Sequence, residues 1–311
     1  MAYASLDNPN LSDRPLHLAI GMFDGVHLGH QSVIEACVSS ATACGGVSGV
    51  LTFWPHPSRL FRKADQATKL FMPLDQKAEY LHKRGIESVI VQPFTSEFAA
   101  IEAEDFPAYL KQKLPTLEAL YVGENFRYGK GRTGTIETLI EGCRKLGMHV
   151  FSAERLRVDG EPISSTRIRV CLEEGDMRQA RALLGYPYTS YGEVIPGRQL
   201  GRTLGFPTLN MAWEPELAPH YGVYAVRVRE DVSSAWIPGV ANYGQRPTVD
   251  KEPAQPLLEA HMLQPVEWGN GTRLTVQWLE FLRPEKKFNG LDELKAQIGA
   301  DRESAARYFG L

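Results

Sequence analysis

The chain has 311 residues, of which 43% are hydrophobic and 23% charged, and its formal net charge is −3. One hydrophobic core rarely serves more than about 250 residues, so we expect two domains. The near-neutral charge offers no bulk attraction to nucleic acid or to anionic membranes, so we expect neither as a partner. Oligomeric state cannot be predicted. The sequence has no secretory signal pattern and no run approaching a membrane span, so we expect a cytoplasmic protein with four reduced core cysteines.

Residues 1–14 are polar, and we expect them to fray. Strand and helix patterns then alternate as far as Gly185. The predicted strands are 16–20, 47–53, 88–94, 119–126 and 149–158, and the predicted helices are 31–39, 75–84, 103–114, 135–146 and 176–184. This alternation predicts an α/β domain with a doubly wound, mostly parallel sheet covered on both faces. Ligands of such sheets bind beyond the carboxyl ends of the strands, so the turns there carry the chemistry.

The turn after the first strand reads Gly-Met-Phe-Asp-Gly-Val-His-Leu-Gly-His from residue 21 to residue 30. A strand, a glycine-rich turn and a helix in this order point free backbone N–H groups and the positive end of a helix dipole at one spot. His27 and His30 face the same spot. The segment therefore predicts a phosphate site, with a tight turn capped by a histidine as the alternative.

Three later segments lie at strand exits or at a helix start. Residues 53–57 read Phe-Trp-Pro-His-Pro, a stiff loop that has either a direct role or only a rigid turn. Residues 122–134 carry four glycines, three cations and two aromatic residues, which suit a loop that closes over a ligand ring and phosphate. Residues 163–169 read Ile-Ser-Ser-Thr-Arg-Ile-Arg at a helix start and form either an N-cap or an anion clamp.

From Tyr186 onward, short runs rich in Val and Tyr are separated by Gly and Pro turns. The runs 192–195, 222–229, 236–240, 257–263 and 272–281 predict a small antiparallel β-barrel. Gly269-Asn270-Gly271 predicts a hairpin turn between the last two strands. Residues 291–309 have apolar residues near helical spacing and predict one or two helices packed on the barrel. We therefore place the domains at residues 1–185 and 186–311.

The barrel half opens with Pro-Gly-Arg-Gln-Leu-Gly-Arg-Thr-Leu-Gly-Phe-Pro-Thr-Leu-Asn at residues 196–210. Its glycines fall four apart, but the flanking prolines argue against a helix. A Walker A loop is excluded, because no Gly-Lys-Ser/Thr follows at the right spacing. Glu259 lies on a predicted strand, where a glutamate taken alone is usually just solvated. His261 lies two residues after Glu259 on the same predicted strand, so both side chains point to the same face of the sheet.

Several of these segments resemble enzyme signatures. Residues 21–30 and 163–169 resemble the paired His-x-Gly-His and Ser-Ser-Thr-x-x-Arg signatures of adenylyltransferases. Residues 122–134 are similar to a loop of prokaryotic FAD synthetases, and residues 205–210 to the flavokinase signature Gly-Phe-Pro-Thr-x-Asn. Residues 238–248 and 258–261 also resemble flavokinase segments. The chain departs from the family pattern at Trp54, where an acidic residue is usual, at Leu209, where Ala is usual, and at 264–271, which replaces an acidic stretch ending Asp-Leu-Tyr-Gly.

The whole pattern resembles the prokaryotic-type bifunctional riboflavin kinase/FMN adenylyltransferases. The resemblance implies that ATP phosphorylates riboflavin to FMN in the barrel and that a second ATP adenylylates FMN to FAD in the α/β domain, both with Mg²⁺. The implied catalytic residues are His27, His30 and Glu259. The implied ATP and phosphate contacts are Gly21, Phe23, Gly29, Ser165, Thr166, Arg169, Gly205, Thr208 and Asn210. Asn125 is the implied flavin contact, and Thr208 and Asn210 are the implied Mg²⁺ ligands.

Two alternatives stay open from the residues. The first is an adenylyltransferase for another phosphate, such as a pantetheine or nicotinate mononucleotide, with the barrel merely attached. The kinase string at 197–210 argues against it. The second is a flavin-binding or sensing protein whose kinase half is inactive around the altered loop at 264–271. The presence of Thr208, Asn210 and Glu259 argues against that.

Overall fold

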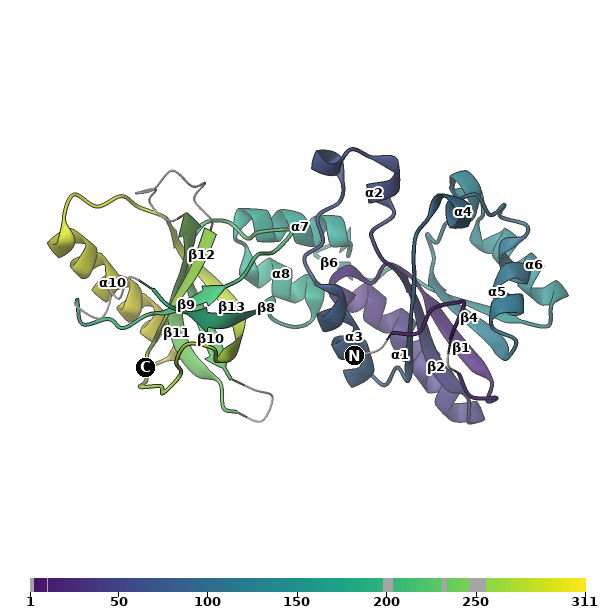
Figure 1. Ribbon diagram of the computed structural model, residues 1–311, viewed down its shortest axis with the longest axis horizontal. Helices are drawn as coiled ribbons and strands as arrows, with labels where there is room; N and C mark the ends of the chain where they lie inside the picture. Colours follow the sequence, from purple (N-terminus) through teal and green to yellow (C-terminus); the bar gives the residue numbers. More distant parts are fainter. Residues whose placement is uncertain (1–2, 10, 198–203, 231–233, 246–255) are drawn as a thin grey trace. The chain divides into compact units, whose positions relative to one another are not determined.

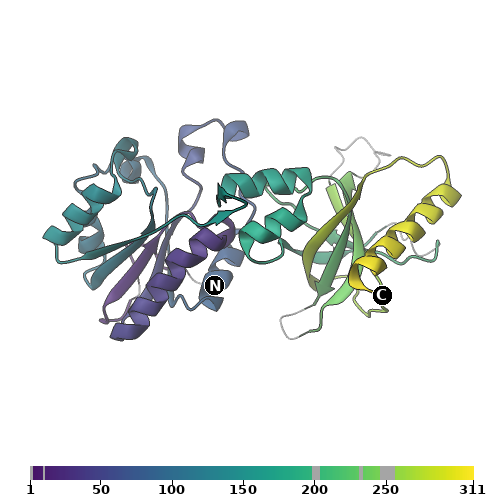
Figure 2. The same ribbon diagram turned by 180° about the vertical axis from the view of Figure 1, so that it is seen from behind.

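The computed structural model describes residues 3–9, 11–197, 204–230, 234–245 and 256–311 (Figures 1 and 2). The chain divides into two compact units, Met1–Ser165 and Thr166–Leu311. Helices α7 (Ser165–Glu174) and α8 (Met177–Leu184) therefore group with the barrel, and a backbone hydrogen bond joins His220 N to Leu172 O. A division at residue 185 remains a prediction about functional domains.

The first unit is built on a parallel sheet of five strands in the order β3-β2-β1-β4-β5. The strands are β1 (Leu16–Ile20), β2 (Val47–Phe53), β3 (Ser88–Gln92), β4 (Leu117–Gly123) and β5 (His149–Ala153). Every pairing between them is parallel, so the predicted α/β class is confirmed. Strands β2 and β3 lie on one side of β1, and strands β4 and β5 lie on its other side. Strand β1 therefore borders the switch point, where ligands of such sheets bind.

Helices cover both faces of this sheet (Figure 2). The longer ones are α1 (Leu28–Cys44), α3 (Leu74–Lys83), α5 (Phe106–Lys113) and α6 (Ile136–Lys145), and the short ones are α2 (Ser58–Phe61) and α4 (Ser96–Ala99). Helix α1 is longer than predicted, because His27 caps its start and Gly45, with φ 67°, ends it. The last predicted strand is shorter, since residues 157–158 and 161–162 form a separate ribbon, β6 and β7 (Arg157–Val158 and Glu161–Pro162).

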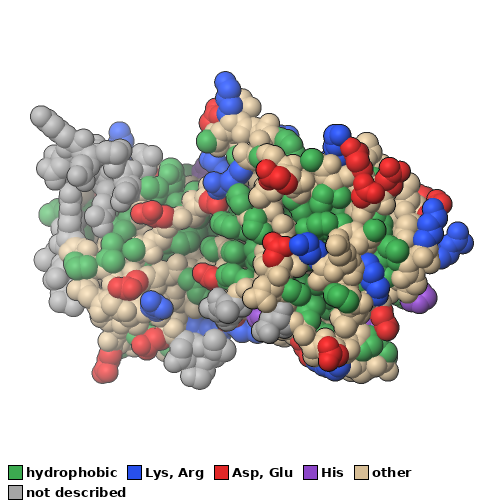
Figure 3. Space-filling model, turned by 45° about the vertical axis from the view of Figure 1, so that its right-hand side comes forward, with side chains coloured by type: hydrophobic (Ala, Val, Ile, Leu, Met, Phe, Trp, Pro, Cys, Tyr) green, Lys and Arg blue, Asp and Glu red, His purple; other side chains and the backbone are tan. Residues whose placement is uncertain are grey.

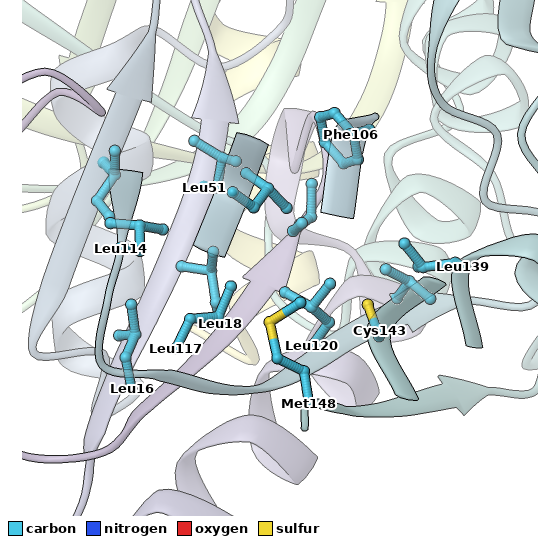
Figure 4. Close-up of a cluster of buried hydrophobic side chains, with 14 of the residues drawn as sticks. Leu16, Leu18, Leu51, Phe106, Leu114, Leu117, Leu120, Leu139, Cys143 and Met148 are labelled. Atoms are coloured by element: carbon cyan, nitrogen blue, oxygen red, sulfur yellow. The ribbon is translucent and has the colours of Figure 1, made fainter. Parts of the chain in front are cut away.

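Two apolar clusters hold this unit together, one on each face of the sheet. Helices α5 and α6 contribute Phe106, Leu110, Leu139 and Cys143 to the first cluster, which Figure 4 shows around Leu18 and Leu120. Helices α1 and α3 contribute Ile34, Cys37, Ala78 and Leu81 to the second. Burying a Leu or Phe side chain contributes about 1.5–3 kcal/mol, so these clusters fix the position of the turns at the sheet edge.

Residues 3–9 are docked against the sheet, and the prediction that they fray is wrong. Ala4 pairs with the edge strand β3, since Ala4 N donates to Val89 O at 3.3 Å and Val91 N donates to Ala4 O at 2.9 Å. Leu6 is buried in the first apolar cluster. The apolar residues of this polar stretch, Leu6 and Leu11 among them, gave no periodic signal, but the burial of Leu6 and two ladder hydrogen bonds stabilise the docked segment.

The second unit contains a closed barrel with the strand order β10-β11-β12-β9-β8-β13, all pairs antiparallel. The strands are β8 (Thr189–Ile195), β9 (Leu209–Ala212), β10 (Gly222–Arg229), β11 (Ile237–Gln245), β12 (Pro256–Met262) and β13 (Arg273–Pro284). The predicted barrel is confirmed, although β9 was not predicted. One helix, α10 (Leu291–Phe309), follows, and its Asp301 accepts hydrogen bonds from Arg283 on β13.

The predicted hairpin at Gly269–Gly271 is wrong. Strand β12 pairs with β11 and β9, whereas β13 pairs with β10 and β8, so the two strands that flank this turn are not neighbours. Gly271 instead donates its N–H to Val194 O of β8, at 2.8 Å. A Gly-Asn-Gly sequence favours a tight turn, and Gly271 has the positive φ such a turn needs (86°), but local sequence does not choose the partner strand.

The charged side chains agree with the near-neutral net charge, and three of the four cysteines lie where the sequence predicts, with Cys44 as the exception. Acidic and basic side chains are interspersed on the face drawn in Figure 3. Among the helices in the described part of the chain, none combines the length and apolarity needed to cross a membrane. All four cysteines are free thiols, but only three are core residues, because Cys44 is exposed at the end of α1.

Candidate functional sites in the two units

The turn after β1 has an unusual backbone. Phe23, Gly25 and Val26 all have positive φ, at 49°, 70° and 37°. A Cβ on Gly25 would lie 1.9 Å from the ring of Phe71, so both backbone and packing require glycine there. Non-glycine residues in this conformation are strained, and such strain persists only where the surroundings hold it. The surrounding structure therefore maintains the strained backbone of this turn.

The two predicted histidines meet at the end of this turn. His27 caps α1, and its Nδ1 accepts a hydrogen bond from His30 N at 3.2 Å. The imidazole rings stack with their centroids 3.6 Å apart and 13° between their planes. Phe23 packs its edge on His30 at 5.2 Å, and a Cβ at Gly29 would approach the His27 ring to 3.3 Å. Both histidines are thus fixed side by side.

Burial and charge keep His30 neutral. Its pKa lies well below the usual 6.5, because burial disfavours the imidazolium and because His27 and Lys77 are close. Its Nδ1 is buried and has no hydrogen-bond partner among the residues that the structure describes. A neutral imidazole offers one donor and one acceptor nitrogen, so this side chain is available to a ligand that enters the site.

A cavity of about 290 Å³ opens beside the pair, at the carboxyl ends of β1, β4 and β5. The predicted residues that line it are Gly21, Phe23, His27, Gly29, His30, Asn125 and Ser165. Arg155 also lines it, and its Nε donates to the amide oxygen of Asn125 at 2.9 Å when the amide is oriented to suit both groups. The sequence gave no signal for Arg155, which follows β5 outside any motif.

Several other residues singled out from the sequence are not among those that line this cavity. Thr166 and Arg169 lie in the first two turns of α7, directly after Ser165, and their part in the site stays a prediction. Tyr128 of the glycine-rich loop is buried in the first apolar cluster and does not present its ring to the cavity surface as a stacking platform. Lys130 of the same loop pairs with Glu102 at 2.6 Å. His56 Nδ1 lies 2.8 Å from Ser58 Oγ and so forms a local turn.

The barrel unit has its own cavity, of about 260 Å³. Gly197, Thr208 and Asn210 line it, together with Trp268 and Asn270 from the loop that departs from the family pattern. Asn210, on β9, is directly opposite Glu259 on β12 in the antiparallel register. Opposed residues in such a pair point to the same face, so the buried amide and the carboxylate lie together. Gly205, the first residue of the Gly-Phe-Pro-Thr-x-Asn motif, has a φ of 90° and lies in a turn.

His261 is a residue whose role the sequence left unassigned. Its Nδ1 lies 2.8 Å from Pro207 O, and its ring meets Phe206 edge-on at 5.6 Å. It therefore anchors the Gly-Phe-Pro-Thr segment from the strand that carries Glu259. The shared face of His261 and Glu259 on one strand was the available signal. Arg246–Thr248 of the 238–248 segment lie outside the described residues.

Comparison with known proteins covers both units. A family model described as FAD synthetase matches residues 10–167, and one described as riboflavin kinase matches residues 184–309. A solved structure described as a macrolide-efflux protein from Streptococcus pneumoniae has a TM-score of 0.86 and 25% identity, and it covers 97% of this chain and 96% of that one.

Two curated relatives that match both units of the chain have the same name. The bifunctional riboflavin kinase/FMN adenylyltransferase of Escherichia coli K12 is 37% identical over 305 residues, which are 97% of this chain and 96% of that protein. The protein of the same name from Bacillus subtilis 168 is 36% identical over 297 residues, 94% of this chain and 92% of that protein. With both cavities lined by the corresponding motifs, this chain belongs to the family of bifunctional riboflavin kinase/FMN adenylyltransferases.

Proposed function

We propose that the chain converts riboflavin to FAD in two steps, one in each unit. The barrel transfers the γ-phosphoryl group of ATP to riboflavin, and the α/β unit adenylylates the resulting FMN with a second ATP. The observation that carries this proposal is that each unit has its own cavity, one lined by His27 and His30 and the other by Thr208 and Asn210. Since ATP is a substrate of both steps, we expect the enzyme to work in the cytoplasm.

In the α/β unit, a phosphate oxygen of FMN attacks the α-phosphorus of ATP, and the bond to the bridging oxygen breaks to release pyrophosphate. This displacement needs no proton transfer, so positioning and charge stabilisation supply the catalysis. His27 and His30 hydrogen-bond the phosphates as negative charge builds up. Ser165, Thr166 and Arg169, at the start of α7, suit the β- and γ-phosphates, because a helix N-terminus and a guanidinium both favour anions. Asn125 contacts the flavin.

In the barrel, the riboflavin hydroxyl attacks the γ-phosphorus while Glu259 accepts its proton, and ADP leaves. Asn210 and Thr208 offer an amide oxygen and a hydroxyl oxygen beside the Glu259 carboxylate, a set of hard donors that fits Mg²⁺. Bound Mg²⁺ would neutralise charge on the ATP phosphates. The family's Asp-Leu-Tyr-Gly is absent, but Trp268 and Asn270 still bring this loop to the cavity, so we expect an active kinase.

The test is to incubate the protein with riboflavin, ATP and Mg²⁺, and to separate the flavins by chromatography. We expect FMN first, then FAD with pyrophosphate, and neither product when EDTA removes the metal. FAD formed only from supplied FMN would contradict an active kinase half. If no flavin is converted, the proposal fails and the two alternative functions return.

A glycine in the barrel cavity provides a finer prediction. A Cβ on Gly197 would lie 1.9 Å from Asn210 Nδ2, so Gly197→Ala must displace the Asn210 side chain or the segment beside it. Overpacking of this kind costs about 1–3 kcal/mol. We expect slower riboflavin phosphorylation and unchanged FMN adenylylation, measured with each flavin supplied separately. Gly290→Ala is the matched control, because a Cβ there meets open space. Equal kinase rates in the two variants would contradict the close packing.

A further inference from the structure

A lysine is buried beneath the turn that carries the histidine pair. Lys77, on α3, is only 2% exposed. Its Nζ donates to Met22 O and to Thr52 Oγ1, both at 2.9 Å, and the Thr52 hydroxyl also donates to Met22 O at 3.1 Å. Lysine is almost never fully buried unless its ammonium group is paired. Here two oxygens satisfy it, and one of them belongs to the strained turn.

The hydrogen bond to Met22 belongs to a set that holds the carbonyl groups of this turn. Val26 O accepts from Gln31 Nε2 at 2.8 Å, and Asp24 O accepts from Ser165 Oγ at 3.3 Å. Met22 immediately precedes Phe23, the first residue with positive φ, and a second such residue is Val26. Strained conformations persist only when surrounding contacts over-determine them. Of these three donors to the turn carbonyls, the Lys77 ammonium is the charged one. Its hydrogen bond to Met22 O lies next to Phe23, where the strained backbone begins.

Electrostatics link the same group to His30. Burial lowers the pKa of Lys77 to about 8, while Asp24 in the turn opposes that shift. Burial, then the neighbouring His27 and then the charge of Lys77 lower the pKa of His30 on α1. These are the groups that face the ammonium from the turn and from α1. Because the pKa of Lys77 is near 8, its charge is present at neutral pH and is lost within the experimentally accessible range.

We propose that Lys77 is a positioning residue for adenylyl transfer, which holds the turn at residues 22–26 in the conformation that aligns His27 and His30. It acts through the hydrogen bond from its Nζ to the Met22 carbonyl. The inference rests on the proposed adenylylation of FMN, and it adds a residue from α3 to a site whose motifs lie elsewhere.

The test compares Lys77→Met with Lys83→Met. Methionine keeps the apolar stem and removes the ammonium, while Lys83, on the same helix, is half exposed and paired with Glu79. A small misplacement of catalytic groups can cost on the order of 100-fold in rate. We expect Lys77→Met to lose FMN adenylylation by about that factor in kcat/KM. Its riboflavin phosphorylation, and both activities of Lys83→Met, should stay at the wild-type level.

Two further readouts separate positioning from a general loss of structure. Without the ammonium charge, the pKa of the His30 imidazole should rise in Lys77→Met, as measured by NMR titration. In the unaltered protein, FMN adenylylation should decline above pH 8 as Lys77 loses its proton, whereas riboflavin phosphorylation should show no such limb. The second readout needs no variant, so it holds even if Lys77→Met fails to fold.

Wild-type adenylylation in Lys77→Met, or a wild-type profile that stays level through pH 8, would overturn the inference while leaving the proposed function intact. If the unaltered protein fails to adenylylate FMN at any pH, the proposed function fails instead. Equal losses in Lys77→Met and Lys83→Met would also contradict a specific role for the buried ammonium group.

Discussion

His30→Ala is expected to reduce the conversion of FMN to FAD by about 100- to 1,000-fold, the loss that follows removal of one preorganised donor to a developing charge. Its imidazole is neutral and stacked on His27 at 3.6 Å, and within the described part of the chain its buried Nδ1 has no hydrogen-bond partner. The variant also removes the ring that orients His27, which adds to the loss. The rate is measured from FMN and ATP by following FAD and pyrophosphate.

The control for His30→Ala is His149→Ala, an exposed histidine on β5 of the same unit. It should leave both activities unchanged. His30→Ala itself should still phosphorylate riboflavin at the wild-type rate, because the barrel cavity lies in the other unit. A folded His30→Ala protein that makes FAD at the wild-type rate would remove the histidine pair from the account.

Glu259→Gln is expected to have the opposite effect. A positioned base contributes about 100- to 10,000-fold to proton transfer, and the amide cannot accept the hydroxyl proton, so riboflavin phosphorylation should fall by that range. Glutamine keeps the size of the side chain and its place opposite Asn210. FMN formation from riboflavin is the measurement, and FAD formation from supplied FMN should be unchanged.

Glu193→Gln serves as the matched control for Glu259→Gln. Glu193 is an exposed carboxylate on β8 of the same barrel, opposite Ala212 rather than Asn210. The control should phosphorylate riboflavin normally. If Glu259→Gln keeps the wild-type phosphorylation rate, another group accepts the proton, and the carboxylate next to Asn210 has only a structural role.

Local sequence predicted the turn after β1 well, because its backbone pattern and its chemistry point to the same place. The run from β1 through the glycine turn to α1 combines a buried strand, a glycine-rich turn and a capping histidine, so two histidines facing one phosphate site could be expected, but the stacking of their rings could not. The parallel sheet followed from alternating strand and helix patterns. Strand partners in the barrel did not follow, because the sequence of a turn does not encode which distant strand it meets, as the Gly269–Gly271 segment shows.

Contacts between distant segments account for most of what the sequence could not provide. Strand β9 has only four residues and lies within a motif read for its chemistry, so its pairing with β12 was not anticipated. Arg155 reaches Asn125 only through the fold. Lys77 did leave a signal, since it lies one helical turn from the buried Leu81 and next to the buried Ala78, and a charge on the apolar face of a helix calls for a partner.

The account depends on two independent sites in one chain, and a mixing experiment tests this most directly. Over a time in which the wild-type protein completes the conversion of riboflavin to FAD, neither variant alone should form more than a small fraction of the FAD: His30→Ala should accumulate FMN, and Glu259→Gln should leave most of the riboflavin unchanged. Combined in equal amounts with riboflavin, ATP and Mg²⁺, they should produce FAD, because FMN released by one protein is a substrate for the other. A mixture in which FMN accumulates and no FAD forms, with both proteins folded, would contradict the separation of the two sites.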